Sequence, residues 1–222
     1  MSNPEKPVVH IDIVSDVMCP WCYIGKKRLE KALAMVKDEV DVAIRWLPFQ
    51  LDATLPPQGK DRRQYLEDKF GGPERADQIY GQIKSAGDGE GIAFDFDAIK
   101  VSPNTFDAHR LIAISMAQTP PKQNAVVDAL FRAFFIDGVN IGDRDNLADI
   151  AASVGMDRDE TYAALMSDEA SEETQNMLAS VGAAGISGVP FFILDQKFAV
   201  SGAQPPDALH DAIRQAAGQG SA

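Results

Sequence analysis

The sequence predicts an α/β fold that carries a large inserted all-helical domain, and two patterns predict it. A strand-helix-strand pattern opens the chain and a strand hairpin lies near its end, so both ends contribute to one sheet. Residues 56–168, between them, show helical periodicity. The 222 residues are 45% hydrophobic, which is enough for a full core. We therefore expect a discontinuous domain of residues 1–55 and 169–222, and an inserted helical domain of residues 56–168.

The first strand, the first helix and the second strand follow one another directly. Apolar and polar residues alternate over residues 8–14, which is the period of a strand. Residues 20–38 have helical spacing, with Pro20 suited to the first turn and the basic residues from Lys26 to Lys31 mostly off the apolar stripe. Alternation returns at residues 42–48. A second strand thus closes a β-α-β unit, whose two strands should pair in parallel.

Helical periodicity continues through the middle of the chain and is interrupted by glycine-rich stretches. The expected helices cover residues 61–70, 73–85, 104–118, 122–136, 144–154, 158–167 and 170–182. Two apolar runs follow at residues 191–194 and 198–200, and Asp195-Gln196-Lys197 between them is typical of a hairpin turn. A last helix is expected at residues 206–217.

The tetrapeptide Cys19-Pro20-Trp21-Cys22 contains the only two cysteines of the chain. It begins the first predicted helix, where unpaired backbone N–H groups and the helix dipole stabilise a thiolate. The apolar stripe places Cys22 on the buried face and Cys19 at the exposed tip. We therefore predict that Cys19 attacks a disulfide and that Cys22, one turn behind, resolves the mixed disulfide. Pro20 and Trp21 should tune the redox potential of the pair.

The two cysteines have three other interpretations. A structural zinc site needs four ligands, and the only histidines, His10, His109 and His210, lie far apart in the sequence. A structural disulfide is disfavoured because a loop of two intervening residues constrains the unfolded chain very little. A pair of ordinary buried thiols remains open as the plain alternative.

Composition excludes several classes of partner. The chain has 21 basic and 33 acidic residues and a net charge of -12, which repels nucleic acid and anionic membrane surfaces. The first seven residues lack the apolar core of a signal peptide, and no run of about 18 apolar residues is present. We expect a cytoplasmic protein. Since thiols stay reduced there, the motif should be catalytic or redox-sensing.

Without the insertion, the order of elements is β-α-β, helix, β-β, helix. This order, together with a Cys-x-x-Cys motif after the first strand, is that of the thioredoxin fold. The chain resembles the DsbA-like thioredoxin family, in particular its FrnE-like branch of disulfide oxidoreductases, related to 2-hydroxychromene-2-carboxylate isomerases and kappa-class glutathione transferases. The matching stretches are Ser15 to Gly25, Pro103-Asn104-Thr105 with Ala108-His109-Arg110, Gly188-Val189-Pro190-Phe191-Phe192, and Val200-Ser201-Gly202-Ala203-Gln204.

The resemblance implies further site residues. Thioredoxin-like folds place a cis-proline opposite the two cysteines, and Val189-Pro190 fits that place, leaving the backbone of Val189 free to bind an extended peptide or glutathione. Asn104 and His109 would lie at the start of a helix that covers the cleft and would contact the substrate. Both have structural alternatives, since Asn104 or Thr105 suits an N-cap and a lone helical histidine often only packs.

The chain departs from its relatives near the motif. DsbA has a histidine between its two cysteines, and this chain has none. The resemblance therefore does not imply a strongly oxidising dithiol. Many thioredoxin-like proteins keep a buried acid six residues before the first cysteine, where this chain has Ile13. Asp12 and Asp16 are alternatives, although we expect both to be solvated at the end of the strand.

The predicted function is thiol-disulfide oxidoreductase or isomerase, acting on protein or low-molecular-weight thiols and disulfides. We expect no bound cofactor and no metal, and a glutathione or thioredoxin system that resets the pair. One alternative is a glutathione-dependent isomerase or transferase, in whose known examples a serine usually replaces Cys19. Another is a chaperone-like binding module on the same fold. The resemblance also allows a homodimer.

Overall fold

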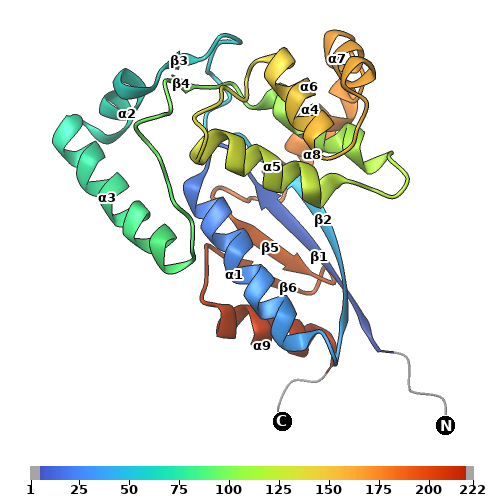
Figure 1. Cartoon of the computed structure of the whole chain (residues 1–222). Helices are drawn as coiled ribbons and strands as arrows, with labels where there is room; N and C mark the ends of the chain where they lie inside the picture. Colours follow the sequence, from blue (N-terminus) through green and yellow to red (C-terminus); the bar gives the residue numbers. More distant parts are fainter. Residues whose placement is uncertain (1–5, 219–222) are drawn as a thin grey trace.

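The computed structural model describes residues 6–218, and a four-stranded mixed sheet lies at its centre (Figure 1). The strand order is β2-β1-β5-β6. β1 pairs with β2 in parallel, and the other two pairings are antiparallel. The predicted β-α-β unit and hairpin are therefore confirmed. The strands are β1 (Val8–Ser15), β2 (Asp41–Pro48), β5 (Phe191–Leu194) and β6 (Phe198–Ser201).

Helices cover both faces of this sheet because each strand directs alternate residues to opposite sides. α1 (Pro20–Val36) and α9 (Pro206–Ala216) pack against each other and against one face. α8 (Ser171–Ala183) packs against β2 on the other face, beside Leu47. The arrangement is the thioredoxin fold expected from the order of elements.

The remaining helices lie between β2 and α8 in the chain and form the insertion (Figure 1). Aspartates begin three of them, since Asp61, Asp143 and Asp157 each accept a backbone N–H of the first turn. The helices are α2 (Arg62–Phe70), α3 (Pro73–Gly89), α4 (Phe106–Met116), α5 (Gln123–Phe135), α6 (Arg144–Ser153) and α7 (Arg158–Met166).

The insertion is not entirely helical, which corrects the sequence prediction. β3 (Lys60–Asp61) and β4 (Val101–Ser102) pair antiparallel in a separate two-stranded sheet. Two residues per strand are too few to show alternation, so no pattern predicted them. The domain division at residues 55/56 and 168/169 stays a prediction.

Aromatic rings join the insertion to α1 just behind the cysteine motif. The ring of Tyr23 stacks on Phe131 of α5 at 5.0 Å and meets Phe94 edge to face at 6.0 Å. Lys26, expected off the apolar stripe, is instead buried, and its Nζ lies 2.7 Å from Asp128 Oδ1 of α5. The prediction for Lys26 is wrong because the periodicity of one helix does not show that α5 packs over its polar side.

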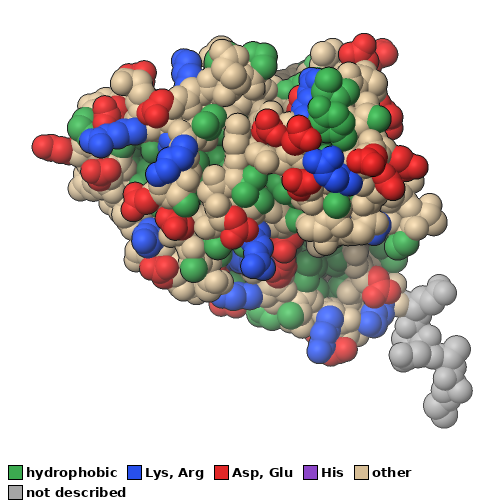
Figure 2. Space-filling view, turned by 45° about the horizontal axis from the view of Figure 1, so that its top comes forward, with side chains coloured by type: hydrophobic (Ala, Val, Ile, Leu, Met, Phe, Trp, Pro, Cys, Tyr) green, Lys and Arg blue, Asp and Glu red, His purple; other side chains and the backbone are tan. Residues whose placement is uncertain are grey.

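Acidic and basic side chains are interspersed over the face shown in Figure 2. Within residues 6–218, no helix has the length and apolar character needed to cross a membrane. In the same range, no group of three or more His, Cys, Asp or Glu side chains is arranged to hold a metal ion. The expectation about the first seven residues concerns mainly residues 1–5, which lie outside the described residues.

Candidate active site

The cysteine motif begins α1 at the point where β1 ends. Cys19 is the N-cap residue, and its N–H donates to the carbonyl oxygen of Asp16 at 2.9 Å. The carbonyl oxygen of Cys19 accepts the N–H of Cys22 at 3.0 Å, which closes the first turn. Both thiols are free, and the two cysteines lie 3.5 Å apart. This separation allows a disulfide to form between them with little movement.

Both thiols are buried, which corrects one prediction. Cys22 is 1% exposed, as its place on the apolar stripe predicted, but Cys19 is only 4% exposed and does not lie at an exposed tip. The Sγ of Cys19 lies 3.9 Å from the carbonyl oxygen of Val189, in the loop that covers it. Trp21 is instead the exposed member of the motif, at 39%. The prediction failed because the loop that covers Cys19 is distant in the sequence, so the periodicity of α1 does not reveal it.

The environment of Cys22 opposes its ionisation. Burial raises the pKa of the Cys22 thiol well above 9.0, and the hydrogen bond and charge of Cys19 raise it further. The Ser15 hydroxyl and a backbone hydrogen bond from Asp16 act in the opposite direction, but their effect is smaller. A thiol that stays protonated at neutral pH is a poor first nucleophile.

The Val189-Pro190 peptide bond is cis, as the resemblance led us to expect. Pro190 is fixed opposite α1, because its carbonyl oxygen accepts the N–H of Gly202 at 2.8 Å. A Cβ atom at Gly25 would lie 2.8 Å from Cγ of Pro190, closer than real contacts allow. Glycine at position 25 thus lets α1 approach the proline loop.

The two insertion residues predicted to contact substrate lie at the start of α4. The side chain of Asn104 accepts the N–H of Phe106 at 2.9 Å and donates to the carbonyl oxygen of Leu55 at 2.6 Å. Thr105, at the N-cap position, makes no such bond with its side chain, so Asn104 is the capping residue. His109 is 3% exposed, and its Nε2 lies 2.8 Å from the carbonyl oxygen of Phe49. Substrate contact by either residue stays a prediction.

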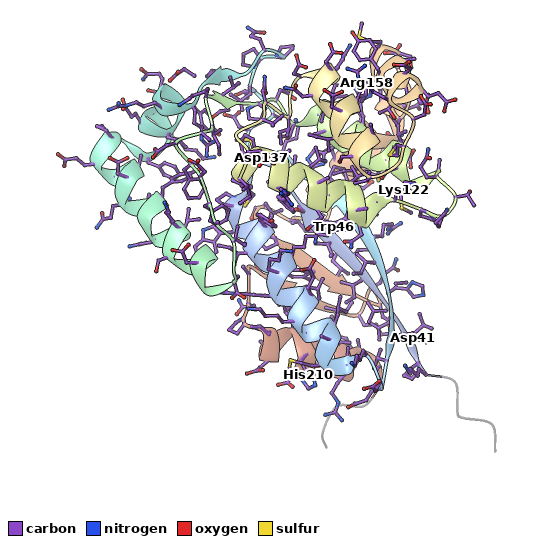
Figure 3. All side chains as sticks on the ribbon, viewed as in Figure 1. Asp41, Trp46, Lys122, Asp137, Arg158 and His210 are labelled. Atoms are coloured by element: carbon purple, nitrogen blue, oxygen red, sulfur yellow. The ribbon has the colours of Figure 1, made fainter. Side chains whose placement is uncertain are left out.

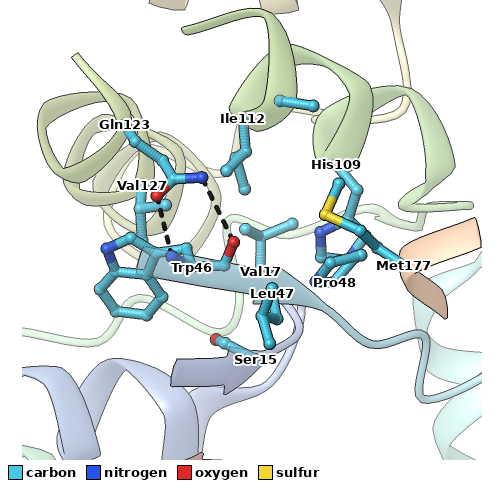
Figure 4. A pocket seen from close by; sticks show the side chains of 11 residues that line it. Ser15, Val17, Trp46, Leu47, Pro48, His109, Ile112, Gln123, Val127 and Met177 are labelled. Atoms are coloured by element: carbon cyan, nitrogen blue, oxygen red, sulfur yellow. Dashed lines mark hydrogen bonds between the residues drawn. The ribbon is translucent and has the colours of Figure 1, made fainter. Parts of the chain in front are cut away.

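A small cavity lies between α4, α5 and the end of β2 (Figure 4). Its volume is about 10 Å³, room for one water molecule. The amide of Gln123 accepts the N–H of Trp46 at 2.8 Å and donates to the same residue's carbonyl oxygen at 3.2 Å. Gln123 thereby covers an edge of the sheet that would otherwise be open to another strand. His109 lines this cavity, which is too small for a substrate.

The burial of two further polar residues was not predicted. Asp16 is fully buried, so the expectation that it is solvated is wrong. Arg62 of α2 is 5% exposed, and it donates to the hydroxyls of Ser102 at 3.2 Å and Tyr80 at 2.6 Å. Its Nε has no acceptor among the described residues, and it lines a cavity of about 570 Å³ between α2 and α3. Only the position of Asp16, directly after a strand and beside the motif, gave a signal in the sequence.

Tyr80 connects Arg62 electrostatically to the cysteines. Burial raises the pKa of Tyr80, the Arg62 guanidinium lowers it, and the charge of the Cys19 thiolate raises it again. Tyr80 therefore lies within electrostatic range of both Arg62 and Cys19.

Comparison with known proteins extends this description. The model of the DSBA-like thioredoxin domain matches residues 10–214. The uncharacterized protein YwbO of Bacillus subtilis (strain 168) is 29% identical over 206 residues, covering 92% of this chain and 96% of YwbO. A crystal structure from Streptomyces coelicolor, named as a probable DsbA oxidoreductase, is 31% identical with a TM-score of 0.84, covering 96% of this chain and 92% of that one.

More distant structures share the fold. A 2-hydroxychromene-2-carboxylate isomerase is 18% identical with a TM-score of 0.70, covering 96% of this chain and all (100%) of its own. The cytosolic disulfide reductase DsbM of Pseudomonas aeruginosa, solved with GSH, is 18% identical with a TM-score of 0.61, covering 93% and 98% of the two chains.

Proposed function

Because the chain belongs to the family of DSBA-like thioredoxin domains, we propose that it is a thiol-disulfide oxidoreductase whose working group is the dithiol of Cys19 and Cys22. One observation carries the proposal. Two free cysteines lie 3.5 Å apart at the N-terminus of α1, beside the cis-proline loop. The Streptomyces relative named as a DsbA oxidoreductase supports the same reaction class.

The proposed reaction has two displacements. The Cys19 thiolate attacks one sulfur of a substrate disulfide, so that a Cys19–substrate disulfide forms and one substrate thiolate leaves. Cys22 then loses its proton and attacks Cys19, which forms the Cys19–Cys22 disulfide and releases the second substrate thiolate. Counted from the two protonated thiols, two electrons and two protons pass from the protein to the substrate. The reverse sequence oxidises a substrate dithiol.

Substrate positioning is assigned to Val189, whose backbone lies beside the nucleophile. Its carbonyl oxygen lies 3.9 Å from Sγ of Cys19, and an extended substrate strand would pair with its backbone groups. We propose protein or low-molecular-weight disulfides as substrates, with glutathione or a thioredoxin system resetting the pair. We also propose a cytoplasmic location, since the neighbour DsbM is described as cytosolic.

A second candidate is a glutathione-dependent transferase or isomerase, and Arg62 favours it. This buried cation bonds two hydroxyls and keeps an unpaired Nε, so it suits the carboxylate of a small anionic ligand. The isomerase and the GSH-bound reductase among the structural neighbours are compatible with such a ligand. The presence of two cysteines weighs against this candidate, because activating glutathione needs no resolving thiol.

The deciding experiment is a redox titration in glutathione buffers, with alkylation and mass measurement of the Cys19 and Cys22 state. We expect one reversible two-electron transition, which Cys19→Ser abolishes. Cys22→Ser should accumulate a mixed disulfide on Cys19, whereas Cys19→Ser should not. If the wild-type chain shows no transition, the dithiol is not the working group. Activity retained in the double serine variant would favour the second candidate.

A further inference from the structure

Asp16 contacts both cysteines through its backbone and fixes that backbone with its side chain. Its carbonyl oxygen accepts the N–H of Cys19 at 2.9 Å, and a hydrogen bond from its backbone lowers the pKa of the Cys22 thiol. Its carboxylate accepts the N–H of Leu51 at 2.7 Å and of Met18 at 3.3 Å. Any movement of this buried carboxylate therefore moves the hydrogen-bond donors around the sulfurs.

His109 completes the contacts of Asp16 from the insertion. Its Nε2 lies 3.5 Å from Oδ1 of Asp16 and 2.8 Å from the carbonyl oxygen of Phe49. Since a carbonyl oxygen only accepts, Nε2 carries a proton and donates it to Phe49. α4 is thereby tied both to the end of β1 and to the segment that follows β2. Both side chains of the pair are almost fully buried, at 2% exposure for His109 and 0% for Asp16.

We propose that Asp16 and His109 are positioning residues through which the insertion sets the redox equilibrium of the Cys19–Cys22 dithiol. The inference rests on the proposed oxidoreductase function. Without the Nε2 donor, the buried carbonyl oxygen of Phe49 loses its hydrogen bond and Oδ1 of Asp16 loses its polar neighbour, so the carboxylate turns toward its remaining donors. The Asp16 backbone, whose carbonyl oxygen accepts the N–H of Cys19, then shifts at the start of α1. The reduced form is destabilised relative to the disulfide.

Two substitutions of His109 isolate the Nε2 contact. In His109→Gln the side-chain amide reaches the place of Nε2 and donates there, whereas in His109→Asn the amide is one carbon too short. Both variants are polar and neutral, so they differ mainly in reach. His210→Asn serves as the matched control, because His210 lies on α9 at the other end of the molecule and contacts Asp211 (Figure 3).

The readout is the equilibrium constant of the dithiol with glutathione, together with the pH profile of Cys22 alkylation. H109N should shift the equilibrium toward the disulfide about tenfold, which is about 30 mV for two electrons. It should also move Cys22 alkylation to higher pH. H109Q and H210N should stay within about twofold of the wild type. A merely structural role for His109 would change stability and leave the equilibrium constant in place.

Several outcomes overturn the proposal. It fails if folded H109N keeps the wild-type equilibrium, or if H109Q shifts as far as H109N. If H109N does not fold, Asp16→Asn breaks the pair from its other side, because an amide NH₂ then faces the donors of His109 and Met18. An unchanged equilibrium in D16N overturns the pair as well. A wild-type chain with no transition overturns the proposed function itself, which distinguishes the two failures.

Discussion

Two regions of the insertion each bury an arginine, and they hold it in opposite ways. Arg110, in α4, is 2% exposed and directs its guanidinium to the end of α7. Every one of its side-chain nitrogens donates a hydrogen bond. The acceptors are a carboxylate oxygen of Asp107 and the carbonyl oxygens of Ala164, Leu165, Ser167 and Glu169.

Arg62, in α2, is also buried, but not all of its side-chain nitrogens donate a hydrogen bond. Its side chain donates only to two hydroxyls, lies over the rings of Tyr80 and Phe134, and keeps Nε without an acceptor in the described part of the chain. The fold requires Arg110, because it satisfies the unpaired carbonyl groups that end a helix. By contrast, little of the fold depends on Arg62. The two arginines are equally buried, so their hydrogen-bond acceptors, and not their burial, distinguish them.

Arg110→Leu should have the largest effect on stability. The substitution removes the guanidinium, so several buried carbonyl oxygens and the carboxylate of Asp107 lose their hydrogen-bond donor. We therefore expect a loss of at least about 3 kcal/mol in the free energy of unfolding. Urea denaturation followed by circular dichroism measures it. The control is Arg158→Leu, an exposed arginine paired with Asp145 and Asp149, which should destabilise the fold far less. Similar losses in both variants would contradict the comparison.

Arg62→Leu should cost much less stability, under about 1.5 kcal/mol, because the two hydroxyls it leaves can rotate to other partners. Its effect should appear in ligand binding. S-methylglutathione, which has no free thiol, should raise the melting temperature of the wild type and not that of the variant. If Arg62→Leu unfolds as readily as Arg110→Leu, Arg62 is a structural residue after all.

Local patterns predicted the elements of the fold well. The helix at residues 73–85 was too short by four residues, but α5 and α8 each differ from prediction by one residue at either end. The cysteine pair was evident from its place after a strand. The thioredoxin order followed from the elements, and the cis bond at Pro190 from the resemblance.

What the sequence could not predict depends on contacts between distant segments. Cys19 and Asp16 are buried by the loop at Val189 and by α4, which lie far along the chain. Lys26 is buried because Asp128 arrives from α5. Arg62 carries no local signal, since an arginine at a helix start is usually solvated. Periodicity reports which face of an element is apolar, and it says nothing about a polar side chain that another element covers.

Tyr65→Phe tests the electrostatics of the Arg62 region through pH. Burial, followed by the charge of Asp52, raises the pKa of Tyr65 from 10.0 to about 12. A folded-state pKa above the unfolded value means that this stabilisation is complete below pH 10 and is lost as pH rises to 12. The free energy of unfolding should therefore fall less steeply over that range in the variant than in the wild type. Equal slopes would show that Tyr65 ionises as freely in the folded chain as in the unfolded one.

Arg144→Ala should have the smallest effect and tests the Arg110 region at its surface. Arg144 is partly exposed, and its Nε lies 2.7 Å from Oδ2 of Asp107, the carboxylate that also pairs with Arg110. The cost should be about 0.5 kcal/mol and should fall with added salt. In an Arg110→Leu background the cost should rise, because Arg144 is then the remaining cation on Asp107. Unfolding experiments on the double-mutant cycle measure this coupling, and strict additivity would mean that Asp107 responds to each arginine separately.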